Sequence, residues 1–265
     1  MRGIVVEPCW PHTTLDGMEF RRIGHGVVDS TNERALAQIT EGLAQHGDVH
    51  VAVGQTLGRG RRGREWISDA GQGLYMSVVL LPQSAIQPAA LTVAAGLALL
   101  DLARDVGVVD ARLKWPNDLV VGQAKLAGIL VETRGLQLDR PHYVIGIGLN
   151  VLQESFPDEL LAERDVTSLL QLSCVRPLED VERLLLTVLA ERLAQVESAP
   201  QQLEQDYPRA ARLDGQGICV ETAEGAYRGV LEGFDFEHGL TLRTADGQHQ
   251  VLLEHAHQVH VDSQG

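Results

Sequence analysis

The segment GRGRRG (residues 58–63) has the G-x-G-x-x-G spacing of a dinucleotide-binding turn, and its interpretation decides the fold class of this chain. A Rossmann fingerprint follows a strand and opens a helix. DVHVAVGQT (48–56) alternates as a strand does, but REWISDAGQG (64–73) combines tryptophan, Ser-Asp and two glycines and predicts irregular backbone. Arginines at the variable positions would also crowd the packing of a helix on the strand. The motif therefore does not predict a dinucleotide-binding fold.

The loop is a local basic island in an acidic chain. Residues 54–66 hold one glutamate and four arginines, Arg59, Arg61, Arg62 and Arg64. They could form a solvated run of charges, an arginine-rich RNA-binding site, or a flexible loop that closes on an anion. Ordering about ten residues costs on the order of 10 kcal/mol, and each charge-assisted hydrogen bond returns about 1.5–3 kcal/mol. Several arginines on one phosphate roughly offset that cost, so we expect a loop that is mobile when empty and ordered when an anion binds.

The composition of the whole chain excludes several classes of protein. The 265 residues carry a formal net charge of −14. Because phosphate attraction supplies most non-specific affinity for nucleic acids, we expect no nucleic-acid role. Three cysteines, Cys9, Cys174 and Cys219, are odd in number and far apart, which predicts neither a disulfide framework nor a zinc site. The sequence shows no signal peptide and no apolar run of about 18 residues, so we expect a cytoplasmic protein without a membrane span.

Lysine is scarce in this chain. Of the 22 Lys and Arg residues, only Lys114 and Lys125 are lysine. Compositional drift from Lys to Arg explains most of this bias. A lysine kept where arginine is otherwise used nevertheless suggests that a compact point charge is needed. The two lysines flank the segment KWPNDLVVGQAK and are candidate site residues.

Hydrophobic patterns predict a mixed α+β domain around the loop. DSTNERALAQITEGLAQHG (29–47) predicts a helix in which Ser30 and Glu33 form a capping box and Gly47 marks the end. Residues 87–107 predict a buried helix, and residues 176–197 predict an amphipathic one. Strands are predicted at 48–56, 73–81, 111–115, 118–121, 124–132 and 143–151.

A second, smaller domain is predicted at the C-terminal end. From Gly215 onward, short alternating runs stand between glycine turns about every ten residues, which is typical of a small all-β barrel. Residues 215–265 contain two arginines and eight acidic residues, a balance that disfavours nucleic-acid binding. We therefore divide the chain into an α+β domain of catalytic size, 1–214, and a β domain, 215–265.

The segment DLVVGQAKLAG (118–128) predicts a hairpin around Gly122 and Gln123, a two-residue turn that begins with glycine. Val120 would then pair with Lys125, and Asp118 and Lys125 would lie on one face of the sheet. This arrangement is either a structural surface ion pair or a functional site. In the second case Lys125 binds a phosphate or carboxylate, and Asp118 positions groups or a metal.

The segment YVIGIGLNV (143–151) is nearly all apolar and predicts a central buried strand. Gly146, Gly148 and Asn150 fall on one face by the two-residue period, which makes a floor without side chains that ends in an amide. The amide suits an adenine edge, although tight packing against a helix also explains the glycines. The sequence contains no G-x-x-x-x-G-K-[ST] motif, so a bound ATP would not be held by a P-loop.

Five motifs occur together and in a fixed order: DSTN (29–32), GQTLGRGRRGREW (54–66), KWPNDL (114–119), KLAGILVE (125–132) and VIGIGLN (144–150). In this combination the chain closely resembles the biotin protein ligases. The resemblance covers residues 29–150 at the level of motifs, and the C-terminal β domain more loosely. It implies a mixed sheet flanked by helices, followed by a small SH3-like β-barrel.

The resemblance also implies the reaction. Biotin and ATP, with Mg2+, would form biotinyl-5′-AMP and pyrophosphate, and biotin would then pass to one lysine of a biotin carboxyl carrier protein domain. Lys125 would contact the biotin carboxylate and the α-phosphate, with Arg59 and Asp118 as the other catalytic residues. The chain would need no nucleophile of its own, because the carrier supplies the amine. The magnesium ligands and the choice between monomer and homodimer stay open.

The remaining site residues are implied in the same way. Ser30, Thr31 and Gln55 would hold the ureido ring of biotin. The full biotin-binding set would be Ser30, Thr31, Asn32, Gln55, Gly58, Arg59, Gly60, Arg61, Lys125, Gly146 and Gly148. The ATP and adenylate set would be Arg59, Arg61, Arg64, Lys125 and Asn150, with Asn150 at the adenine and Trp66 packed on the loop.

Two other functions compete with this one. Lipoate or octanoate ligases and transferases share the fold, but the polar set Ser30, Thr31 and Gln55 favours biotin over a plain acyl chain. A non-catalytic biotin-responsive regulator is disfavoured by Lys125 and the arginine loop. Some biotin protein ligases carry an N-terminal helix-turn-helix domain; only 28 residues precede DSTN here, so we expect no DNA-binding domain.

Overall fold

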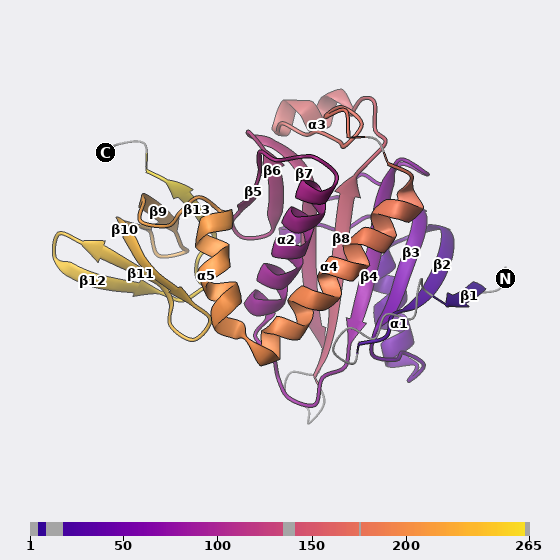
Figure 1. The fold of residues 1–265 in the computed structure, drawn as a ribbon, viewed down its shortest axis with the longest axis horizontal. Helices are drawn as coiled ribbons and strands as arrows, with labels where there is room; N and C mark the ends of the chain where they lie inside the picture. The colour runs from indigo at the N-terminus through magenta and orange to yellow at the C-terminus, as the bar shows by residue number, and fades with distance from the viewer. Residues whose placement is uncertain (1–4, 9–17, 135–140, 175, 263–265) are drawn as a thin grey trace.

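The computed structural model describes residues 5–8, 18–134, 141–174 and 176–262, which form two β-sheets with helices packed around the larger one (Figure 1). The strands of the larger sheet are β1 (Val5–Pro8), β2 (Arg21–Val28), β3 (Asp48–Gln55), β4 (Gly73–Leu80), β5 (Ala111–Lys114), β6 (Asp118–Val121), β7 (Ala124–Arg134) and β8 (His142–Asn150). Their spatial order is β1-β2-β3-β4-β8-β7-β6-β5. β2 and β3 run parallel and the other neighbours run antiparallel, so the sheet is mixed, as predicted.

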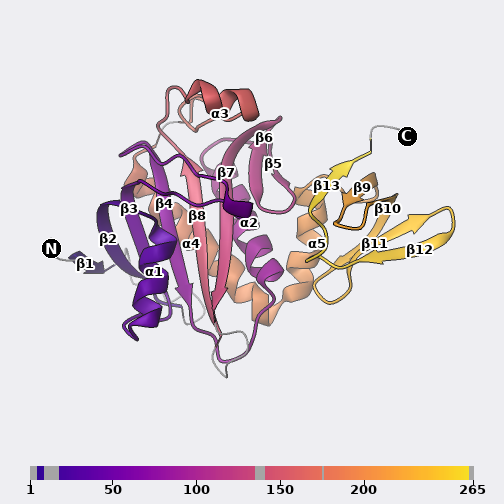
Figure 2. The same ribbon diagram turned by 180° about the vertical axis from the view of Figure 1, so that it is seen from behind.

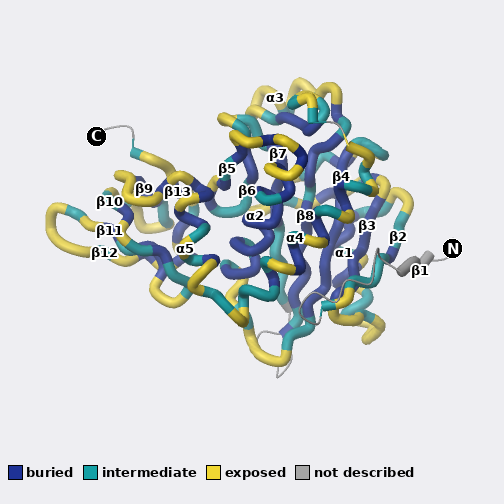
Figure 3. Tube along the Cα trace, viewed as in Figure 1, coloured by how far each residue is buried: buried dark blue, intermediate teal, exposed yellow. Residues whose placement is uncertain are grey.

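Helices cover both faces of this sheet. α2 (Pro88–Asp105) and α4 (Leu178–Ser198) lie on one face, and α1 (Thr31–Thr40) lies on the opposite face, as the front and back views show (Figures 1 and 2). Buried residues concentrate in the central strands and in α2 (Figure 3). α2 is buried on most sides because its alanines and leucines contact both the sheet and α4. The predicted α+β architecture, a mixed sheet flanked by helices, is confirmed.

The helix predicted at 29–47 is correctly placed but too long, and its capping box is wrong. α1 ends at Thr40. Ser30 occupies the N-cap position, yet its side chain makes no capping hydrogen bond. Glu33 instead forms an ion pair with Arg59 of the basic loop. A contact between distant segments therefore replaces the local capping arrangement.

Two glycines explain where α1 ends and where β3 begins. Gly42 has φ +71° and turns the chain just after the helix. Gly47, which we expected at the helix end, has φ +86°, and a Cβ there would lie 2.2 Å from the carbonyl oxygen of Glu19. Gly47 therefore permits a close approach at the start of β3 and does not cap the helix.

The structure contains elements that the hydrophobic pattern did not predict. They are β1, β2, α3 (Asp158–Glu163) and α5 (Pro200–Ala210). β2 gives a weak pattern because Ile23 is its one buried residue. Residues 1–4 and 9–17 lie outside the described part of the chain, so the expectation that no DNA-binding domain precedes DSTN falls partly on residues that the structure does not describe.

The C-terminal strands form the second sheet, which is antiparallel. They are β9 (Gly217–Glu221), β10 (Ala226–Asp235), β11 (Gly239–Thr244), β12 (Gly247–Val251) and β13 (Gln258–Val261), in the order β12-β11-β10-β9-β13. Three aromatic rings join this sheet to the first: Phe234 stacks on Tyr207 of α5 at 5.0 Å and meets Trp115 edge-on at 6.3 Å between ring centroids. Trp115 Nε1 also donates to the carbonyl oxygen of Ala256 at 2.7 Å. The second sheet is therefore anchored beside β5 and β6.

Two further expectations concern cysteines and membranes. Cys174 and Cys219 are free thiols, and Cys9 lies outside the described residues. Among the helices in the described ranges, none combines the length and apolar character needed to cross a membrane.

Candidate active site

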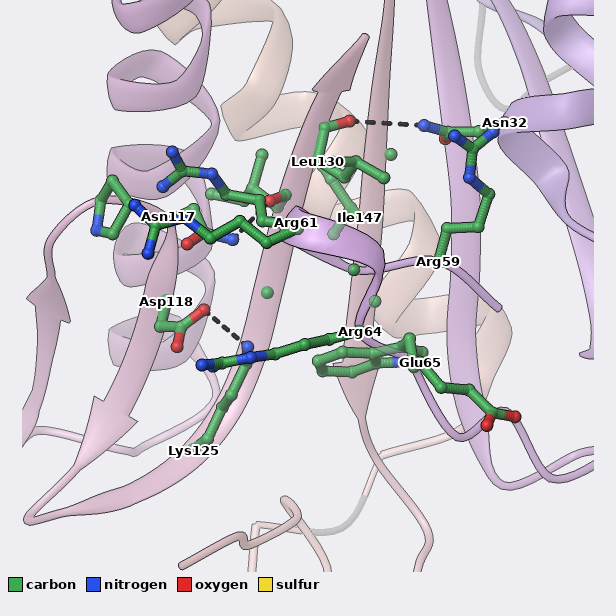
Figure 4. Close-up of a pocket in the computed structure, with 18 of the residues that line it drawn as sticks. Asn32, Arg59, Arg61, Arg64, Glu65, Asn117, Asp118, Lys125, Leu130 and Ile147 are labelled. Atoms are coloured by element: carbon green, nitrogen blue, oxygen red, sulfur yellow. Dashed lines mark hydrogen bonds and ion pairs between the residues drawn. The ribbon is translucent and has the colours of Figure 1, made fainter. Parts of the chain in front are cut away.

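The predicted hairpin is present, and it brings Asp118 and Lys125 together. Val120 pairs with Lys125 and Val121 with Ala124, as expected from the Gly-Gln turn. Lys125 Nζ lies 2.6 Å from Asp118 Oδ1, and the lysine side chain is only 14% exposed. Figure 4 shows the two side chains facing each other, with Arg64 extending toward them. The lysine side chain is therefore largely buried, the Asp118 side chain is 25% exposed, and both line a cavity.

The surroundings of Lys125 are short of negative charge. Burial lowers the pKa of Lys125, and this is the largest cause; Asp118 opposes it, whereas Arg164 and Arg64 lower the pKa further. An anion bound beside Lys125 would offset the excess of positive charge, because it stabilises the ammonium and both guanidinium groups. The site is thus built to receive negative charge.

The glycine face of β8 also forms as predicted, but two side chains lie directly on it. A Cβ at Gly146 would come within 2.3 Å of Asn32 Oδ1, and a Cβ at Gly148 within 2.4 Å of the Trp66 indole. The same indole would lie 3.0 Å from a Cβ at Gly128 of β7. These glycines therefore allow Asn32 and Trp66 to lie flat on the sheet. A direct contact between the glycines and biotin stays a prediction.

The basic loop is irregular, as expected. β3 ends at Gln55, and a short 3-10 turn, η1 (Arg61–Gly63), follows in the loop. The turn is closed by a hydrogen bond from the Gly60 amide to the Arg64 carbonyl oxygen at 2.7 Å. Because no helix follows the G-x-G-x-x-G motif, the dinucleotide interpretation is excluded. The predicted change from a mobile to an ordered loop stays a prediction.

Arg59 holds the loop against the sheet. Its guanidinium pairs with Glu33 of α1 and, at 3.0 Å, with Glu132 of β7. Glu132 also accepts a hydrogen bond from Asn32 Nδ2 at 2.8 Å. The sequence pattern assigned no role to Glu132, because its partners come from segments far from it in the chain. It links the loop to α1.

A buried polar network connects the residues expected at the ureido ring. Gln55 Oε1 accepts from the Thr31 amide at 2.8 Å, and Gln55 Nε2 donates to Ser68 Oγ at 2.8 Å. Ser77 Oγ lies 2.7 Å from Thr31 Oγ1 and 2.5 Å from Asn32 Oδ1. Ser77 was missed from the sequence, although a serine within the apolar run GLYMSVVLL is a signal that could have found it. These groups offer donors and acceptors to a polar ring.

Most of the predicted site residues line one cavity, called here the larger cavity. Those it brings together are Ser30, Thr31, Asn32, Gln55, Arg59, Gly60, Arg61, Arg64, Asp118, Lys125, Gly146 and Gly148. Gly58 is not among them, since it packs against the backbone of Trp66, whose oxygen would lie 2.1 Å from a Cβ. Gln258, the first residue of β13, and His257, which directly precedes it, also line this cavity, a contribution that no sequence pattern indicated.

Asn150 lines a second, smaller cavity. Its walls include the apolar side chains of Ile67, Phe156, Leu160 and Val166, together with the amide of Gln153. Glu65, Trp66, Lys125 and Arg164 line both cavities. Lys125 Nζ lies 5.2 Å from the centroid of the Trp66 ring, a distance typical of a cation–π contact. The cations therefore stand where the two cavities meet.

Comparison with known proteins agrees with this geometry. Residues 24–150 match the model of the biotin/lipoate A/B protein ligase family. A biotin–[acetyl-CoA-carboxylase] ligase of Mycobacterium tuberculosis is 38% identical over 74% of this chain and 73% of its own length. The structure of a biotin protein ligase from Aquifex aeolicus in complex with biotin and ATP superposes with a TM-score of 0.73 at 27% identity, covering 91% of this chain and 99% of that one.

The bifunctional ligase/repressor of Salmonella typhimurium is 39% identical over 53% of this chain. That match spans 44% of the relative's own length. The fold, the site and these similarities together define the family. The chain belongs to the biotin protein ligases, within the biotin/lipoate A/B protein ligase family.

Proposed function

We propose that this chain activates biotin with ATP and transfers it to a lysine of a biotin carboxyl carrier protein domain. The observation that carries the proposal is the position of Lys125, a buried ammonium at the border of two cavities. The biotin carboxylate and the α-phosphate repel each other, so positive charge must gather both before they react. A carboxylate oxygen then attacks the α-phosphorus, which forms biotinyl-5′-AMP and expels pyrophosphate.

The division into two cavities supports one arrangement of the substrates. Biotin would occupy the larger cavity, with its ureido ring at Thr31 and Gln55, which present polar groups there. The adenine would occupy the smaller cavity, which has apolar walls and the amide of Asn150. Lys125 would then meet the carboxylate and the α-phosphate, and Arg61 and Arg64 would meet phosphate oxygens. The loop would also keep water from the mixed anhydride.

Magnesium would reach the site on the triphosphate. Across the described ranges, no three His, Cys, Asp or Glu side chains are grouped to hold a metal. Mg2+ commonly binds through one or two carboxylates together with substrate phosphates. Asp118 and Glu65 line the larger cavity and fit this mode. The ion would neutralise part of the phosphate charge.

The second step needs an amine from the partner. The neutral amine of the carrier lysine attacks the acyl carbon of biotinyl-5′-AMP, forming an amide and releasing AMP. We place the carrier beside the C-terminal sheet, since Gln258 of β13 and the preceding His257 line the larger cavity. Closure of this sheet as an SH3-like barrel, the domain boundary between 214 and 215, a cytoplasmic location and a monomeric or dimeric state stay predictions.

Biotin-dependent exchange of labelled pyrophosphate into ATP tests the proposal. We expect exchange with biotin and much less with lipoate, because the polar network suits a ureido ring. Exchange supported by lipoate alone would favour the lipoate ligase alternative. Binding of biotin without any exchange would favour a non-catalytic regulator.

A further inference from the structure

Gln153 lies in the smaller cavity, just after β8, and neither the sequence motifs nor the comparisons assign it a role. It is 5% exposed and lines the cavity together with Asn150. Its backbone is held in place, because Ser168 Oγ donates to the Gln153 carbonyl oxygen at 2.7 Å. The side chain is thus a buried amide in a fixed position.

The hydrogen bonds of its neighbours determine how the Gln153 amide is turned. The carbonyl oxygen of Thr167 can only accept, and it accepts from Asn150 Nδ2 at 2.9 Å. Asn150 must therefore present Oδ1 toward Gln153, whose Nε2 donates to it at 3.3 Å. The same Nε2 lies 3.5 Å from the hydroxyl oxygen of Tyr75.

In this orientation the Gln153 nitrogen Nε2 makes both contacts, and the oxygen Oε1 makes neither of them. It is buried and has no hydrogen-bond partner among the described residues. A buried acceptor without a donor is unfavourable, and an incoming N–H group would remove the penalty. Gln153 lines the smaller cavity, so this unpartnered acceptor belongs to a side chain of the cavity wall.

The walls of the cavity indicate what kind of ligand brings that donor. The indole of Trp66 and the side chains of Phe156 and Val166 suit a flat ring. Lys125 and Arg164 stand at the border with the larger cavity and suit a phosphate. A purine nucleotide meets both conditions. Adenine presents a 6-amino donor, whereas guanine presents a 6-oxo acceptor at the same position.

We propose that Gln153 Oε1 accepts a hydrogen bond from the 6-amino group of the ATP adenine and so selects ATP over 6-oxo purine nucleotides. This inference rests on the proposed function. Asn150, which the family resemblance places at the adenine, acts as a positioning residue that fixes the orientation of the Gln153 amide.

The wild-type protein provides the first test. Biotin-dependent pyrophosphate exchange is measured with ATP, with purine riboside triphosphate, which has hydrogen at position 6, and with GTP. We expect a KM about tenfold higher for purine riboside triphosphate than for ATP, the effect of one hydrogen bond. GTP should be poorer still, because its 6-oxo group faces Oε1. Equal KM values for the three nucleotides would overturn the inference.

The second test removes the acceptor. Gln153→Leu should raise the KM for ATP about tenfold and leave the KM for purine riboside triphosphate within about twofold. A merely structural role of Gln153 would raise both values equally, and that result would overturn the inference. Gln201→Leu is the matched control, because Gln201 is exposed and lines neither cavity. If Gln153→Leu does not fold, the wild-type comparison alone decides.

Failure of the proposed function gives a different result. In that case the wild type shows no exchange with any nucleotide. Calorimetric binding of the same three nucleotides to the wild type then decides the inference separately. Tighter binding of ATP than of the other two supports the role of Gln153, and equal binding contradicts it.

Discussion

At the scale of single residues, Lys125 illustrates how surroundings set the chemistry of a side chain. A lysine at this position of an exposed hairpin would be an ordinary solvated charge. Here it is buried against Trp66, pairs with Asp118 and lies near two arginines. Because the cavity is partly shielded from water, charge interactions in it are stronger than at the surface. A carboxylate and a phosphate therefore gain more from this ammonium as their charges approach.

Lys125→Ala should abolish most adenylate formation while biotin still binds. The charge is needed chiefly when carboxylate and phosphate come together, which is a transition-state interaction. We expect a fall in pyrophosphate exchange of about a hundredfold or more. Lys125→Arg should also be impaired, because a planar fork does not replace a point charge. Exchange at a near-normal rate in Lys125→Ala would contradict the assignment, and biotin-induced thermal stabilisation checks that the variant is folded.

The pH dependence of exchange should report the same ammonium. Burial lowers the pKa of Lys125, so activity should fall on the alkaline side at a lower pH than an ordinary lysine would require. Asp118 raises that pKa, and Asp118→Asn should therefore move the fall to still lower pH. The measurement is kcat/KM for ATP against pH in both proteins. An unchanged alkaline limb in Asp118→Asn would show that Lys125 is not the titrating group.

At the scale of elements, the basic loop and the strands beneath it form one unit. Arg59 holds the loop to α1 and β7 through Glu33 and Glu132. Arg61 lines the larger cavity, where partial burial and then the charge of Arg62 lower its pKa, and Asp118 opposes this shift. The arginines of one short loop thus have different partners, which their spacing in the sequence did not reveal.

Arg61→Gly should let the adenylate escape. The substitution removes one charge-assisted phosphate contact, about 1.5–3 kcal/mol, and raises the ordering cost of the loop by up to about 1 kcal/mol. Retention of biotinyl-5′-AMP should weaken by roughly a hundredfold. Exchange should persist, because Lys125 still gathers the charges. The measurement is biotin incorporation into an added lysine-rich protein that is not a carrier.

Arg62→Gly is the matched comparison for Arg61→Gly. Arg62 has φ +58°, a conformation that glycine adopts readily, so the substitution removes the same charge without straining the turn. Arg62 also lines the larger cavity, but glycine relieves the positive φ there and does not add to the ordering cost of the loop, so we expect less stray biotinylation from this variant than from Arg61→Gly. Equal labelling by both variants, or none by Arg61→Gly while exchange persists, would mean that Arg61 does not retain the intermediate.

At the scale of the whole molecule, the C-terminal sheet contributes Gln258 of β13 to the wall of the larger cavity. The ring cluster of Trp115, Tyr207 and Phe234 joins it to the larger sheet. Trp115 directly precedes the turn that leads to Asp118, and His257, directly before β13, lines the larger cavity. Packing between the two sheets should therefore influence both stability and adenylate formation.

Phe234→Ala tests this coupling. Truncation of the buried ring should lower the free energy of unfolding by about 3–5 kcal/mol and reduce exchange as well, because Trp115 loses a packing partner. Tyr227→Ala is the control: Tyr227 lies in the same strand but stacks on His249 of β12, at 4.3 Å between ring centroids. Urea unfolding and exchange are measured for both variants. Equal losses in the two would contradict a specific role of the ring cluster.

Local patterns predicted a large part of the fold and of the site. The Gly-Gln turn set the register that pairs Val120 with Lys125, and the two-residue period placed Gly146 and Gly148 on one face. Both inferences succeeded because turn chemistry and strand alternation act over a few neighbouring residues. The predicted capping box of α1 was wrong because a capping box is also a local signal. Glu33 forms an ion pair with Arg59, which is distant in sequence, and no local pattern indicates that contact.

The side chains that contact the hairpin and the glycine face of β8 depend on the tertiary structure. Trp66 covers Gly148, Glu132 joins α1 to the basic loop, and Thr167 orients the amides that leave Gln153 with a free acceptor. Each of these contacts joins segments that are separated in sequence. A hydrogen bond or a close approach of this kind depends on the simultaneous position of several elements. The residues adjacent in sequence do not indicate such a contact, so only the tertiary structure reveals it.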